Sequence, residues 1–381
     1  MECDGSFQKK RIIGQNNIVT IIAPPSPEYQ LGFLSKLQRL FNEGDFTATY
    51  KFALMVAMAD LAVELGQDDG CTLLLTKEQL AEKFIELYWQ QATPYSVAAD
   101  ECDLNEPIIE SSSLVLAQNK GIQTAIVKNI ITFRATFNPR SLIAAKAMPS
   151  FKKLLNSVSA TVMKMPVTYL QNLGGQAEPF LYNTLSNGIE LLPGVAYCLR
   201  RFQPLVQQLS RNGWINHIKG NRLNQSILGE QDDLESFLFG TSRKSLLVIS
   251  AGLRKISNKC FYCQQTLRSE ADVDHFIPFS QYPRDLMHNF VIAHPSCNRS
   301  KSNVLAAREH LERWVEYIDR EDVNLTTIGK DAGKVTDLPV IRAVARWGYG
   351  NAVQSSAQAW IRATCFEAVN KDYLDILDVI R

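Results

Sequence analysis

The sequence predicts a mainly α-helical protein with one short segment of strands near residue 275. Apolar residues recur at helical spacing in three N-terminal segments, 29–41, 47–66 and 76–95. Helical patterns return after residue 303, in NVLAAREHLERWVEYI and later in AQAWIRATCFEAVNKDYLDIL. Between these regions, VDHFIPFS (273–280) carries strand-forming residues and then Pro278, which ends strand pairing. We therefore expect a large helical N-terminal region, a small mixed domain and a helical C-terminal extension.

The N-terminal helices have recognisable ends. Residues 1–27 are expected to form a leader with a short strand, IVTIIA, which two prolines close. The second helix ends at Gly66, and Thr76 is the predicted N-cap of the third. Glu78 lies near the positive end of that third helix, and Pro94 stops it. Residues 112–172 are expected to add two or three further helices.

The expected domain boundaries follow composition. A stretch near 224–245 mixes glycine, serine and acids and is the predicted linker. We expect residues 1–235 to form the helical region, with a part at 111–229 that is rich in lysine and arginine. Residues 244–320 then form the small mixed domain, and residues 321–381 form the helical extension.

Composition limits the class of protein. Apolar residues make up 46% of the chain and charged residues 21%, which are ordinary values for a globular protein. No run of 18 apolar residues occurs, so no membrane span is expected. The start MECDGSFQKK lacks the apolar stretch of a secretion signal. Eight cysteines in 381 residues are too sparse for a disulfide scaffold, and a cytoplasmic location with reduced or metal-bound thiols is expected.

The charge is distributed unevenly. Residues 28–110 are rich in acids, whereas residues 111–229 hold thirteen lysines or arginines and two acids. Such an excess of positive charge favours a polyanion partner for a DNA-binding or regulatory part of the chain, and nucleic acid is the candidate polyanion. A solvated basic face, or one that pairs with the acidic N-terminal segment, is the alternative. The candidate nucleic-acid-binding residues of this region are Lys152, Lys153, Arg200 and Arg201.

Two cysteine and histidine pairs indicate a metal site. Cys260 and Cys263 are separated by two residues, and so are His294 and Cys297. A gap of two residues lets both side chains of a pair face one ion, and two such pairs complete a tetrahedral zinc site. Because protein side chains fill all four positions, the zinc is expected to be structural. The other cysteines have no such spacing.

The segment 258–303 resembles the HNH (ββα-metal) endonuclease family. The resemblance lies in the order C-x₂-C, V-D-H-x-I-P, N-x-V and H-x-x-C-N-R-x-K. It implies that two strands and a helix hold one divalent metal beside a zinc site. Two positions depart from the common pattern. His294 stands where many members have a third zinc cysteine, and Asn298 stands where the last histidine of the family name would be.

The resemblance assigns roles to residues at the matching positions. His275 is the expected general base, since an imidazole titrates near neutral pH. Asp274 and Asn298 offer oxygen ligands for Mg²⁺ or Mn²⁺. Asn289 is expected to brace the loop that aims His275 at the phosphate.

Basic residues after the second metal pair have an expected role as well. Lys301 and Arg299, in the first turn of the following helix, are expected to meet the nucleic-acid backbone. His288 is expected to be exposed. No recognition helix or finger that reads bases is evident, so readout of sequence is not expected.

The expected activity is metal-dependent hydrolysis of DNA. One active site per chain predicts a nick, and the sequence leaves the oligomeric state open. Two alternatives remain: a zinc-stabilised nucleic-acid-binding or scaffold protein that has lost catalysis, and an HNH nuclease that cleaves RNA.

A second resemblance concerns the N-terminal region. ATYKFALMVAMADLAVE and ELYWQQATPY look like the helical region of HNH proteins from bacterial anti-phage and restriction systems, such as the type II Zorya nuclease. This resemblance implies a role in defence against phage or foreign DNA. It also implies work with other subunits of a defence system.

Overall fold

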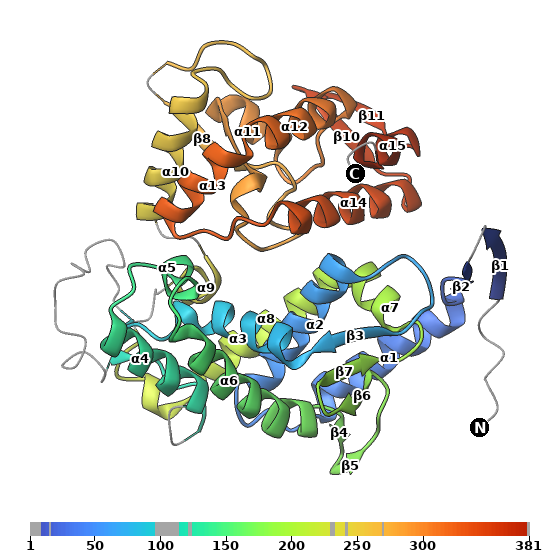
Figure 1. Ribbon diagram of the computed structural model, residues 1–381, viewed down its shortest axis with the longest axis vertical. Coiled ribbons are helices and arrows are strands. Elements are labelled where there is room, and N and C mark those ends of the chain that lie inside the picture. The colour runs from blue at the N-terminus through green and yellow to red at the C-terminus, as the bar shows by residue number, and fades with distance from the viewer. Residues whose placement is uncertain are drawn as a thin grey trace. The chain divides into compact units, whose positions relative to one another are not determined.

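The computed structural model describes residues 9–14, 17–95, 114–120, 124–228, 233–240, 243–268 and 270–378. The chain divides into two compact units (Figure 1). Unit 1 comprises residues 1–138 and 149–240, and unit 2 comprises residues 139–148 and 241–381. Helices dominate both units, so the protein is mainly α. Among the described residues, no helix combines the length and apolar character that crossing a bilayer requires.

Unit 1 is built around one apolar helix. This helix, α2 (Tyr50–Leu65), is buried over nearly its whole length. A helix that is apolar on all sides belongs in the interior, and α2 contacts α3, α7 and α8. The helices of this unit are α1 (Pro27–Glu43), α2, α3 (Lys77–Trp89), α4 (Ala125–Phe137), α6 (Phe151–Val162), η2 (Met163–Val167), α7 (Val195–Arg201), α8 (Gln203–Lys219), η3 (Arg222–Asn224) and α9 (Leu234–Phe239).

The helix starts of unit 1 use side-chain caps. The predicted cap of α3 is confirmed: the Thr76 hydroxyl accepts from the backbone N–H of Gln79, and the Gln79 side chain accepts from that of Thr76. This reciprocal pair satisfies two donors that the first helical turn leaves without partners. At the start of α1, Ser26 accepts a hydrogen bond from the N–H of Tyr29.

Short strands complete unit 1. The predicted strand after residue 17 is present and pairs in an antiparallel hairpin with a second strand. A three-stranded sheet in the order β3-β7-β6 was not predicted. The strands are β1 (Lys9–Gly14), β2 (Asn17–Ile22), β3 (Leu73–Thr76), β4 (Asn172–Leu173), β5 (Gln176–Ala177), β6 (Tyr182–Leu185) and β7 (Gly188–Leu191).

Unit 2 holds the antiparallel hairpin of β8 (Asp272–His275) and β9 (Phe290–Ala293), which contacts neighbouring helices. Its helices are α5 (Leu142–Lys146), α10 (Arg243–Ile256), η4 (Met287–Asn289), α11 (Pro295–Lys301), α12 (Arg308–Arg320), α13 (Asp322–Ala332), α14 (Leu338–Gln354) and α15 (Asp372–Asp378). Its strands are β8 (Asp272–His275), β9 (Phe290–Ala293), β10 (Gln358–Arg362) and β11 (Cys365–Ala368). The segment 321–381, expected to be a separate extension, lies in the same unit as the hairpin.

The prediction of one helix over AQAWIRATCFEAVNKDYLDIL (357–377) is wrong for the first half of that segment. That half forms the antiparallel strands β10 and β11, and only α15 is helical. Trp360 explains the difference, because its N–H donates to Leu305 and its carbonyl accepts from Ala307. Backbone pairing with a distant segment, together with burial of the indole, outweighs the local helical pattern.

Candidate metal and catalytic centre

The hairpin β8–β9 and helix α11 form a continuous ββα arrangement. In the antiparallel register, Asp274 faces Val291 and His275 faces Phe290. Helix α11 begins directly after β9 and contacts β8. Side chains alternate along a strand, so Asp272 and Asp274 share one face of β8 and His275 lies on the other.

The first cysteine pair sits in a tight backbone turn. Gln264, just after the pair, has a φ of 60°, in the left-handed region. The N–H of Gln264 donates to the carbonyl of Cys260 at 3.0 Å, and the N–H of Cys260 donates to Gln265 at 2.9 Å. Cys260 is buried, and Cys263 is exposed. The turn therefore fixes both thiols on one side of the loop.

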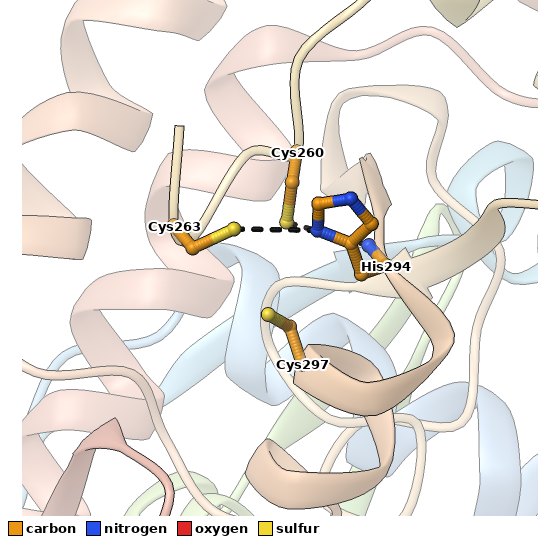
Figure 2. Close-up of side chains that lie close together, drawn as sticks. All are labelled: Cys260, Cys263, His294 and Cys297. Atoms are coloured by element: carbon orange, nitrogen blue, oxygen red, sulfur yellow. Dashed lines mark hydrogen bonds between the residues drawn. The ribbon is translucent and has the colours of Figure 1, made fainter. Parts of the chain in front are cut away.

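The second pair lies at the start of α11. His294 is the N-cap residue of this helix, and Cys297 lies in its first turn. The four possible ligand atoms of Cys260, Cys263, His294 and Cys297 lie within 4.8 Å of one another. Figure 2 shows them converging on a common centre. The close spacing predicted from the sequence is present in the structure.

The donor set fits a zinc ion. His294 donates from Nε2 to the carbonyl of Thr266 at 3.3 Å, and its Nδ1 lies 3.3 Å from the Cys263 sulfur. A carbonyl that accepts from one ring nitrogen leaves the other nitrogen free to bind metal. Burial, together with the neighbouring Cys260 and Cys263, raises the pKa of the Cys297 thiol to about 12. Three thiolates this close need a cation between them, and zinc prefers such sulfur and imidazole ligands.

Asp274 is engaged within the protein. The Tyr262 hydroxyl donates to its Oδ2 at 2.5 Å, and the Lys301 ammonium lies 3.2 Å from the same oxygen. Lys301 also donates to the carbonyl of His275 at 2.9 Å. Lys301, expected to meet nucleic acid, has 0% exposure in the structure. Its charge neutralises Asp274 instead of facing solvent.

Asn298 lies next to a different carboxylate. Its side-chain amide donates to Oδ2 of Asp272 at 3.0 Å. Asp272 and Asp274 project from the same face of β8, and Asn298 contacts the first of these two carboxylates. Such hard oxygen donors suit Mg²⁺ or Mn²⁺. An ion at Asp274 would share that carboxylate with the Lys301 ammonium.

Asn289 fixes the loop that follows His275. Its side chain accepts from the N–H of Ile277 at 2.8 Å and donates to the carbonyl of Ile277 at 2.9 Å. Asn289 itself is completely buried. The backbone two residues after His275 is therefore held by both hydrogen-bonding groups of one amide. These two hydrogen bonds fit the predicted role of Asn289, which is to hold the loop after His275 in place.

The predicted basic residues have different surroundings. Lys152, Lys153 and Arg299 are exposed, and Arg201 is half-buried. Arg200 is only 5% exposed. It pairs with Asp68 at 2.9 Å and donates to the last carbonyls of α2, at Ala62 and Val63. These contacts hold the Arg200 side chain against α2 inside unit 1, so its guanidinium does not face solvent.

Sequence reasoning missed several neighbours of the site. Tyr262, Asp272 and Asp285 contact predicted site residues, yet none had been singled out. Tyr262 lies inside the first cysteine pair, which is the one local signal that marked it. The expectation that His288 is exposed is wrong: its side chain is 1% exposed and bonds Asp322 at 2.8 Å. The fold buries it beneath α13.

The ββα arrangement and the cysteine-histidine cluster support an HNH endonuclease domain. Residues 260–307 match the family described as HNH endonuclease, which supports this class. Residues 30–238, more than half of the chain, match the family described as Domain of unknown function (DUF8808). The chain belongs to that family. The comparisons with curated proteins and with solved structures gave no match, and none of the comparisons supports the resemblance to the type II Zorya nuclease.

Proposed function

We propose that the protein is a metal-dependent endonuclease that hydrolyses phosphodiester bonds of DNA. The proposal rests on one observation: the HNH-matching hairpin carries His275 at the end of β8, where Lys301 donates to the His275 carbonyl and Asn289 holds the backbone at Ile277. A phosphodiester is anionic and has a poor leaving group. Its hydrolysis needs a base for water and positive charge at the phosphate.

His275 is the proposed base. It is partly exposed, and it lies at the edge of the hairpin where a water molecule can reach it. Asp274 and Asn298 are the proposed ligands of Mg²⁺ or Mn²⁺, with Asp272 beside them. The ion would supply the positive charge that a scissile phosphate requires. Asn289 keeps His275 oriented by fixing the loop at Ile277.

The structural zinc would have a separate task. Its proposed ligands lie just before and just after the hairpin, so the ion ties both ends of the catalytic segment together. Cys297 directly precedes Asn298 in α11. Loss of zinc should therefore disturb the catalytic residues through the fold, because structural zinc sites supply folding free energy.

Supercoiled plasmid provides the test. Zinc-loaded wild-type protein with Mg²⁺ or Mn²⁺ should produce open circles before linear DNA, since one site cuts one strand. His275→Ala should lower the rate by at least about 100-fold, the usual contribution of a general base. Asp331→Ala, at an exposed residue of unit 2, is the control and should retain activity. A folded, zinc-loaded wild type that leaves plasmid intact with either metal contradicts the proposal.

Parallel substrates separate the remaining alternatives. Labelled tRNA cut in preference to DNA would favour the RNA-cleaving reading. Binding of either nucleic acid without cleavage would favour a zinc-stabilised binding or scaffold protein. The exposed lysines 152 and 153 are the proposed contacts for the DNA backbone, because phosphate contacts supply most of the affinity of such proteins.

A role in defence against phage or foreign DNA remains a proposal that rests on the N-terminal sequence alone. Its test is a plaque assay on bacteria that carry the gene together with its neighbours. Fewer plaques with wild type than with His275→Ala would support the role, and equal numbers would count against it. Co-purification of the neighbouring gene products would support work with other subunits.

A further inference from the structure

His275 has a carboxylate partner outside the predicted site. Its Nε2 lies 2.9 Å from Oδ1 of Asp285, which belongs to the loop between β8 and η4. The other oxygen of Asp285 accepts from the Lys334 ammonium at 2.8 Å. The three side chains form a chain from the imidazole to a lysine that lies beyond the HNH-matching residues 260–307.

Asp285 is ionised at neutral pH. Burial raises the pKa of its carboxyl, but the hydrogen bond from His275 and the charge of Lys334 outweigh burial and lower it to about 2. An ionised carboxylate only accepts hydrogen bonds. The imidazole must therefore donate from Nε2, which leaves Nδ1 without a proton when the ring is neutral.

Two aromatic rings hold the imidazole plane. The centre of the Phe290 ring lies 4.6 Å from that of His275, and the Phe279 ring lies 5.2 Å away. Both are inclined by 48° to the imidazole. Packing against these rings limits rotation of the imidazole, so the hydrogen bond to Asp285 selects one orientation.

The backbone places Lys334 beside Asp285 by direct strand-like pairing. Leu286 pairs in parallel with Val335, and the N–H of Met287 donates to the carbonyl of Val335 at 2.9 Å. Gly333, with a φ of 69°, turns the chain out of α13 immediately before Lys334. The turn and the pairing make the position of Lys334 a property of the fold rather than of a flexible side chain.

We propose that Asp285 and Lys334 are positioning residues for His275, which fix its Nε2–H tautomer and leave Nδ1 as the nitrogen that takes the proton. This inference rests on the proposed nuclease function for its catalytic consequence. It assigns a task to the segment after residue 321: through Lys334 that segment completes the environment of the base. The HNH-matching residues alone do not contain the whole arrangement.

The tautomer is measured directly by nitrogen NMR of histidine-labelled protein. His275→Ala identifies the signals of residue 275, and the tautomer is read from the spectrum of its neutral ring. Wild type should show His275 protonated at Nε2. Asp285→Ala removes the acceptor, and the two tautomers should then mix. Asp285→Asn is the second variant, because its amide can also donate to Nε2 and so admit the other tautomer.

Cleavage kinetics supply the second readout. Asp285→Ala should lower kcat about 100-fold, while KM for DNA changes less than about twofold. Lys334→Met should have a smaller effect in the same direction, because the carboxylate remains. Matched controls are Asp331→Ala and Lys330→Met, both exposed near the end of α13. These controls should retain the wild-type spectrum and kcat.

The spectra and the kinetics together test the positioning role of Asp285. A wild-type His275 protonated at Nδ1, or an Asp285→Ala variant with unchanged tautomer and kcat, overturns the inference. A wild type that does not cleave, with an intact Nε2–H signal that Asp285→Ala abolishes, instead refutes the nuclease proposal and leaves the positioning contact established. The spectrum therefore separates failure of the inference from failure of the function.

Discussion

The Lys301 ammonium lies 3.2 Å from the Asp274 carboxylate, and neither side chain is more than 10% exposed. Burial lowers the pKa of Lys301, and the negative charge of Asp274 raises it in part. Charges removed from water persist only when they are paired. The pair therefore couples helix α11 to strand β8 at the residue that is proposed to bind the catalytic ion.

Lys301→Met should destabilise the protein strongly, because it leaves Asp274 charged, buried and unpaired. The expected loss in free energy of unfolding is about 3–5 kcal/mol. The double variant Asp274→Asn with Lys301→Met should lose less than the sum of the two single changes. Urea unfolding measures these values, with Lys330→Met as the exposed control. Additive losses would show that the two side chains do not interact.

Loss of one zinc ligand should lower stability and metal content together. Cys263→Ser should bind less than one zinc per chain, whereas Cys365→Ser, at an exposed cysteine outside the cluster, should bind as wild type does. A loss of about 3 kcal/mol would lower the unfolding midpoint by about 6–12 °C. Metal analysis and thermal unfolding check both points. Equal zinc content in the two variants would contradict the assigned site.

Asn289→Ala should leave both backbone groups of Ile277 without their partners. Each unsatisfied buried polar group costs about 1–3 kcal/mol, so the expected loss for the two groups is about 2–6 kcal/mol. Asn289→Asp keeps an acceptor for the Ile277 N–H but cannot donate to the carbonyl, and it should not restore stability. Asn324→Ala, at an exposed side chain, is the control. Denaturant unfolding that does not distinguish Asn289→Ala from this control would refute the bracing role.

The low pKa of Asp285 predicts how the free energy of unfolding changes with pH. Its folded pKa of about 2 lies below the ordinary value of 3.8. Its contribution is therefore complete above pH 3.8 and is lost as the pH falls through about 2. The difference in free energy of unfolding between wild type and Asp285→Ala should shrink by about 2 kcal/mol between about pH 5 and pH 2. A difference that stays constant, as expected for Asp331→Ala, would contradict the ionised state of Asp285.

Substitution of exposed basic residues in unit 1 should weaken DNA binding, whereas substitution of buried ones should lower stability. Lys152→Ala with Lys153→Ala should weaken DNA binding and reduce the slope of log affinity against log salt by about 2. Arg200→Ala should leave that slope unchanged and destabilise unit 1 by about 2–3 kcal/mol, because two carbonyls of α2 lose a donor. Lys36→Ala, exposed and outside the basic region, is the control. An unchanged slope in the double variant would remove these lysines from the proposed DNA interface.

Local patterns in the sequence determined the helices and the metal cluster. Apolar periodicity placed α1, α2 and α3, and the chemistry of Thr76 placed a helix start, because these features depend on residues within a few positions of one another. Pair spacing alone identified Cys260, Cys263, His294 and Cys297, because a two-residue gap fixes the direction of both side chains.

The tertiary structure alone decided which partners the catalytic candidates have. Lys334 reaches Asp285 across 49 positions of the chain, and no local pattern encodes that contact. The burial of Lys301 and Arg200 likewise depends on elements that pack over them, so their charge alone wrongly indicates a surface. Trp360 became part of a strand through pairing with residues 305–307. Sequence fixes local geometry, whereas the environment of a charged group depends on distant segments that the fold brings to it.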